Sequence, residues 1–108
     1  MPQYMLQFAY KPETWAALTK NPVDRSDAIR GLAENLGGRF VSLNYTMGEY
    51  DGVVVVDAPD DVTALSVVLA AIGPGHVRST KTARLYTPQE MMQAMKKAGG
   101  VKYTAPQG

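Results

Sequence analysis

The sequence predicts an α+β fold built on one four-stranded antiparallel sheet. Three observations indicate it. Four short segments carry the apolar alternation of strands, helical patterns that end at glycine or proline follow the first and the third of them, and 108 residues suffice for one core but not for two. The elements follow in the order strand, helix, strand, strand, helix, strand, with one more helix at the end.

The N-terminal part of the chain is expected to form a strand and a helix. Residues 4–10 place strongly apolar side chains at every second position, as a strand with one buried face does. Pro12 suits the first turn of a helix, and helical spacing of apolar residues runs through residues 15–36, with an interruption at 21–22. The glycine pair at 37–38 ends this helix.

Two strands joined by a short turn are expected next. Residues 39–47 alternate between an apolar face and a largely polar one, to which Phe40 is assigned. Residues 52–57 contain four consecutive valines and are apolar on both faces. Gly48 lies in the connection, and we expect it to take a positive φ angle in the hairpin.

The C-terminal part predicts a helix, a strand and a last helix. Residues 59–61 (Pro, Asp, Asp) suit a helix start, because carboxylates are favoured at the positive end of the helix dipole. The buried stripe of this helix is expected to comprise Leu65, Val68, Leu69 and Ile72. Residues 73–75 (Gly, Pro, Gly) stop it, and a strand follows at 77–86. Residues 87–90 then supply an N-cap, a proline and a capping-box partner for a helix whose methionines are expected to fill the core.

This order of elements is the ferredoxin-like arrangement, βαββαβ, with an extra C-terminal helix. Right-handed crossovers put both long helices on the same face of the sheet and leave the other face bare. The valines of residues 52–57 point both ways, so a bare face would expose an apolar patch. We expect a second copy to cover it, giving a homodimer of the dimeric α/β-barrel type. Residues 1–98 are the expected domain, and 99–108 a flexible C-terminal tail.

Composition excludes several classes of function. The chain has no cysteine, which excludes disulfides, thiolate catalysis and cysteine-ligated metal sites, and a single histidine without suitably spaced carboxylates gives no metal site. A net charge of +1 gives no basic field for nucleic acid or an anionic membrane, and no basic run accompanies the strand aromatics that could stack on bases. No apolar stretch approaches about 18 residues, and no targeting segment is visible. We expect a cytoplasmic protein without cofactor, metal, nucleic-acid or membrane partner.

Three residues are candidate catalytic groups. Tyr50 could stabilise a developing oxyanion or donate to a ligand, or else pack its ring and satisfy its hydroxyl. Asp51 could act as a general base if it is desolvated, or cap amide groups of the hairpin. His76 follows a Gly-Pro-Gly turn at the rim of the sheet. It is either solvated, a general acid or base, or the sole axial ligand of a heme.

Four residues are candidate ligand-binding groups. Arg78 could clamp a carboxylate or phosphate, or face solvent or pair across strands. Tyr10 and Trp15 could wall an aromatic pocket, or serve packing in the core or the dimer. Asn44 belongs to a set of alternating polar residues that could line the barrel interior, and alternation alone leaves open which face they take. The set is Ser42, Asn44, Thr46, Arg78, Thr80, Thr82 and Arg84.

Four separated segments of the chain resemble the GYD-domain family. They are Gly48, Glu49, Tyr50 and Asp51 ahead of the valine-rich strand, then Ala58, Pro59, Asp60 and Asp61, then Gly75 to Thr80, and finally Thr87, Pro88, Gln89 and Glu90. The resemblance extends from Tyr4 to about Met95. It implies a ferredoxin-like, dimeric α/β-barrel fold, a class that includes cofactor-free monooxygenases, isomerases, lactone-processing enzymes and heme-degrading proteins. It implies no single activity, and His76 departs from the family pattern, so no role is carried over to it.

Two classes of function follow from these residues. The first is a homodimeric small-molecule-binding protein, including a cofactor-independent enzyme, in which Tyr50, Asp51, His76 and Arg78 meet a small organic acid or aromatic metabolite. The second is a non-catalytic regulatory or protein-interaction module whose hairpin and 73–75 loop serve the dimer interface. A closed pocket where polar side chains converge would favour the first class.

Overall fold

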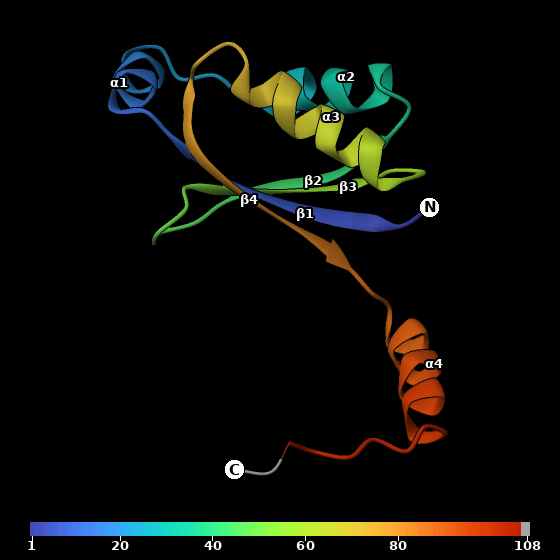
Figure 1. Ribbon diagram of the computed structural model, residues 1–108. Coiled ribbons are helices and arrows are strands. Elements are labelled where there is room, and N and C mark those ends of the chain that lie inside the picture. The colour runs from blue at the N-terminus through green and yellow to red at the C-terminus, as the bar shows by residue number, and fades with distance from the viewer. Residues whose placement is uncertain (107–108) are drawn as a thin grey trace.

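In the computed structural model, which describes residues 1–106, one four-stranded antiparallel sheet carries three helices on a single face (Figure 1). A fourth helix stands apart, beyond the opposite face. The elements are β1 (Gln3–Tyr10), α1 (Pro12–Lys20), α2 (Ser26–Asn35), β2 (Arg39–Tyr45), β3 (Gly52–Asp57), α3 (Asp61–Ile72), β4 (Val77–Leu85) and α4 (Pro88–Gly99). The predicted α+β, ferredoxin-like fold with an extra C-terminal helix is confirmed.

The sheet has the strand order β2-β3-β1-β4. β1 lies in the middle and pairs antiparallel with both β3 and β4, and β2 forms the other edge as the hairpin partner of β3. The helix predicted over residues 12–36 is divided into α1 and α2, with the break at the predicted interruption. Gly37, at φ 91°, follows α2 in a left-handed conformation that favours glycine.

The core lies between the sheet and the helices α2 and α3. The alternating residues of β1 are all buried and lie opposite Val54 and Val56 of β3, and they pack against Ala33 of α2 and Val67 and Val68 of α3. The β1 residues are Tyr4, Leu6, Phe8 and Tyr10. The face of β1 that the sequence predicts as apolar is therefore the face under the helices.

The orientation of α3 differs from the prediction. Its buried residues are Ala64, Val67 and Val68, whereas Leu65 and Leu69 are more than half exposed. Of the predicted stripe only Val68 is buried. The helix is apolar around most of its circumference, so hydrophobic spacing could not select the face, and the small Ala64 allows the closer approach to the sheet.

The face assignments on β2 also need correction. A bulge between Phe40 and Ser42 shifts the register, so that Phe40 lies opposite Val56 on the helix side. Ser42 and Asn44 lie opposite Val55 and Val53 on the bare face. On β4, by contrast, Thr80, Thr82 and Arg84 lie opposite the helix-facing residues of β1. The polar residues predicted as one possible lining are thus divided between the two faces.

The glycine that the β2–β3 hairpin requires is Gly52 and not Gly48. Gly48 does not have a positive φ, and a methyl group added to it would meet nothing within 4 Å. Gly52 lies directly opposite Phe8, whose ring covers it, and a methyl group there would overlap Phe8 Cζ and lie 2.7 Å from Cε1. The prediction for Gly48 was wrong because a ring on the neighbouring strand, and not the turn conformation, demands a glycine.

The helix α4 begins with the predicted capping box, in which Thr87 Oγ1 accepts from Glu90 N and a Glu90 carboxylate oxygen accepts from Thr87 N. No residue of α4 is buried, and Met91, Met92 and Met95 are about half exposed, so these methionines do not fill the core of this chain. The predicted tail, 99–108, extends beyond the described residues.

The bare sheet face carries Val53 and Val55 of β3, which are half-buried in the single chain. The homodimer that would cover them stays a prediction. Within residues 1–106 no helix is long and apolar enough to cross a membrane.

Candidate functional site

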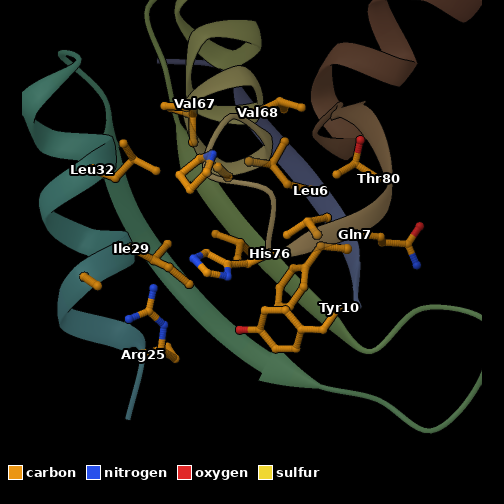
Figure 2. Close-up of a pocket in the computed structure, with 17 residues that line it drawn as sticks. Leu6, Gln7, Tyr10, Arg25, Ile29, Leu32, Val67, Val68, His76 and Thr80 are labelled. Carbon is orange, nitrogen blue, oxygen red and sulfur yellow. The ribbon is translucent and has the colours of Figure 1, made fainter. Parts of the chain in front are cut away.

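An apolar cavity of about 180 Å³ lies between the sheet and the helices α2 and α3 (Figure 2). Leu6 on β1 contributes to the sheet side, and Ile29 and Leu32 of α2 face Val67 and Val68 of α3 across the space. An apolar cavity of about 150 Å³ is enough to bind benzene. The cavity therefore has room for one aromatic ring or a short branched alkyl group.

Three polar side chains meet at one end of this cavity. Figure 2 shows the guanidinium of Arg25, the imidazole of His76 and the hydroxyl of Tyr10 directed toward the same space. Arg25 and His76 are exposed, whereas Tyr10 is buried. The result is a pocket with an apolar interior and a polar end that can donate hydrogen bonds and carries a fixed positive charge.

The Tyr10 hydroxyl keeps its proton under ordinary conditions. Burial raises the pKa of Tyr10 well above its usual range, and the hydroxyl of Tyr45 raises it further, while the nearby Arg25 opposes this shift. A protonated phenol can donate a hydrogen bond to an acceptor on a ligand. Tyr10 thus serves the pocket as a neutral donor beside the charge of Arg25.

The position of His76 is fixed through its backbone. Its carbonyl oxygen accepts from Lys11 N at 3.0 Å and from Thr14 Oγ1 at 2.8 Å, which ties the start of β4 to the start of α1. Gly75, at φ 87°, turns the chain immediately before it. Because these bonds use only the carbonyl, the imidazole stays available at the pocket end.

Asp51 joins three elements behind the pocket. Its Oδ2 accepts from Tyr10 N at 2.9 Å and from Trp15 Nε1 at 3.0 Å, so one carboxylate oxygen holds the end of β1 and the first helix together. Its own backbone N donates to Phe8 O at 2.8 Å, and its carbonyl accepts from Thr46 N at 2.8 Å. In this geometry Asp51 positions Tyr10 and Trp15 and does not point into the cavity.

Four aromatic rings pack around this junction. Tyr10 lies 5.1 Å from Phe8 and 5.1 Å from Trp15 between ring centroids, and Tyr45 lies 6.2 Å from both Phe8 and Trp15. Tilted and edge-on contacts of this kind contribute about 0.5–1.5 kcal/mol per pair beyond burial. The cluster and the Asp51 carboxylate hold the Tyr10 ring in place at the end of the pocket.

The structure brings together only part of the predicted site. Tyr10 and His76 line the cavity, and Trp15 packs edge-on against Tyr10 behind it. The other predicted residues do not line it.

Tyr50 lies in the hairpin, where its carbonyl accepts from Thr46 Oγ1 at 2.5 Å. Asn44 lies on the bare face, and Arg78 is exposed near the irregularity in the β1–β4 pairing. Arg25, which sequence reasoning missed, stands in the break between α1 and α2, where no motif marks it. Within residues 1–106 no three His, Asp or Glu side chains are grouped closely enough to hold a metal ion.

Comparison with known proteins gives a family model and a shared fold. The model described as GYD domain matches residues 4–95. No curated protein matched the sequence. Two solved structures are similar, namely TTHA0845 from Thermus thermophilus and MtbAldR.

The chain is 18% identical to TTHA0845 at a TM-score of 0.53, over 81% of this chain and 95% of that one. It is 12% identical to MtbAldR at a TM-score of 0.58, over 80% of this chain and 53% of that one. The chain thus corresponds to about half the length of MtbAldR. At these identities the likeness shows the fold alone.

Proposed function

We propose that this chain, which belongs to the GYD-domain family, binds a small organic acid with an apolar body and works as a homodimer. The observation that carries the proposal is the cavity between the sheet, α2 and α3, whose interior is apolar and whose end gathers Arg25, His76 and Tyr10. A ligand with a ring or a branched alkyl group and one carboxylate matches both halves of this pocket.

The chemistry of the polar end favours an anion. A guanidinium can donate two parallel hydrogen bonds to a carboxylate, and charge-assisted bonds of this kind are about twice as strong as neutral ones. The neutral Tyr10 hydroxyl and the His76 imidazole add donors on either side. Apolar walls restrict the remainder of the ligand to groups that lose nothing on leaving water.

The homodimer is supported by the bare face of the sheet. Val53 and Val55 lie on it beside Met5 and Ala83, all only partly buried, and form an apolar strip across three strands. Facing sheets of two copies would remove this strip from water. The pocket lies on the other face, so each copy would keep its own site.

Binding is favoured over catalysis by the state of Asp51. A general base must be free to reach a proton on the substrate, and Asp51 Oδ2 is already bonded to two structural donors. A cofactor-independent reaction is the second candidate, and the exposed imidazole of His76 beside the Tyr10 hydroxyl favours it, since histidine is the side chain that most often transfers protons in enzymes.

Benzoate and benzamide provide the test, because they share a ring and differ in the charge of the head group. Benzoate is expected to raise the melting temperature more than benzamide does, and calorimetry is expected to show that Arg25→Gln weakens benzoate binding by about 10-fold or more, the value of one charge-assisted hydrogen bond. Arg30→Gln is the matched control, because Arg30 lies over the ring of Phe40 at 4.6 Å and does not line the cavity. Equal affinity of the two ligands, or full affinity in Arg25→Gln, would contradict the proposal.

A further inference from the structure

Two helices of this chain expose apolar stripes that nothing covers. On α3 the stripe consists of Val62, Leu65, Leu69 and Ile72, and the first three are more than half exposed. On α4 it consists of Met91, Met92 and Met95, each about half exposed. We call these the α3 stripe and the α4 stripe. Uncovered helix faces of this size are unusual in a protein that stays monomeric.

The helix α4 does not cover the α3 stripe of its own chain. Figure 1 shows α4 beyond the bare side of the sheet, whereas α3 lies on the opposite side. The radius of gyration is 17.7 Å, against about 13 Å for a compact domain of this length, which reflects the projecting arm. The capping box at Thr87 and the Arg84–Glu90 ion pair at 3.5 Å fix the start of α4 close to the end of β4.

We propose that α4 of one copy docks antiparallel on the α3 stripe of a second copy, so that the two chains exchange their C-terminal arms. The arrangement rests on the homodimer proposed above. Facing sheets lie about 10 Å apart, and the helices of each copy form the layer outside its own sheet. The helices of a partner stacked on the bare face would therefore lie on the side toward which α4 projects.

Length and charge select the antiparallel direction. Both helices have 12 residues and so span about 18 Å, which lets the two stripes match along their whole length. Antiparallel docking brings the C-terminal half of α4, with Lys96 and Lys97, toward Asp60 and Asp61 at the start of α3. Parallel docking would instead bring Glu90 toward these aspartates.

Cysteine crosslinking tests the arrangement, since the chain has no cysteine of its own. With the stripe centres aligned, Leu65 of one copy faces Met95 of the other. A Leu65→Cys chain is mixed with a differently tagged Met95→Cys chain and oxidised mildly. We expect the mixed disulfide several-fold in excess over the one formed with Gln93→Cys, which lies on α4 away from the stripe. Circular dichroism checks that each variant is folded, as the exposure of these positions leads us to expect.

Each other outcome overturns the inference in a recognisable way. Equal yields with Met95→Cys and Gln93→Cys would show that the stripes do not meet. A crosslinked monomer from the doubly substituted chain would show that α4 folds back on its own α3. Light scattering on the unsubstituted chain separates the two proposals. A monomer would refute the homodimer together with the arm exchange, whereas a dimer without the crosslink would refute the arm exchange alone and leave the pocket untouched.

Discussion

Substitution of the two hairpin glycines by alanine separates the roles that the structure gives them. Gly52 lies under the ring of Phe8, and a methyl group on it would stand 2.7 Å from Phe8 Cε1. Favourable carbon contacts are about 3.5–4.0 Å apart, so the ring would have to shift by about 1 Å. Phe8 is only 8% exposed and packs on Tyr10 and Tyr45, so this shift would disturb the aromatic cluster.

The expected cost can be worked from a matched pair of variants. Both Gly52→Ala and Gly48→Ala reduce the freedom of the unfolded chain by a similar amount, about 0.4–1 kcal/mol, so this gain cancels in their difference. The remaining term is overpacking at Gly52, typically about 1–3 kcal/mol. Since Gly48 has open space around it and no positive φ, Gly48→Ala should be neutral or slightly stabilising.

Urea denaturation and thermal melting measure this difference directly. We expect Gly52→Ala to melt at least about 4 °C below Gly48→Ala, from about 4–8 °C per kcal/mol in a domain of this size. Phe8→Leu should reduce the penalty of Gly52→Ala, because it removes the ring atoms that the methyl group meets. Greater destabilisation by Gly48→Ala than by Gly52→Ala would refute the reasoning and restore the turn interpretation of Gly48.

Two further predictions concern carboxylates. Asp51→Asn keeps the shape but loses the charge that Tyr10 N and Trp15 Nε1 bond to, so the free energy of unfolding should fall by about 1–2 kcal/mol and the fluorescence of the single tryptophan should change; unchanged stability would contradict a structural role. The hydrogen bond from Thr63 N lowers the pKa of Asp60, so its stabilisation is present above about pH 4 and is lost as the pH falls toward the lowered value. Acid titration should show a smaller loss of stability in Asp60→Asn, an N-cap that does not titrate, and identical curves would count against this assignment.

Much of the fold could be predicted because local patterns and long-range contacts agree. The alternation over residues 4–10 identifies the core strand, and the capping box at 87–90 identifies the start of α4. The bulge at Val41 carries no sequence signal, and without it Phe40 is assigned to the wrong face. The apolar pattern of α3 surrounds most of the helix, so only packing against the sheet selects its buried side.

The candidate site was less predictable because its residues come together only in the folded chain. The two donors to the Asp51 carboxylate lie 41 and 36 residues away, at Tyr10 and Trp15, and the motif around Asp51 does not indicate them. Arg25 lies in a break between helices and belongs to no motif, yet it reaches the same cavity as His76. Tyr10 and His76 were identifiable from their residue types and their places at strand ends.

An NMR titration with benzoate tests the central claim most directly, because backbone amide signals report where in the molecule the ligand lies. The account predicts that the signals of Leu6, Ile29 and His76 move with a common affinity, and that those of Asn44 and Val53 on the bare face stay in place. Shifts confined to the bare face, or no saturable shift at the cavity, would contradict it.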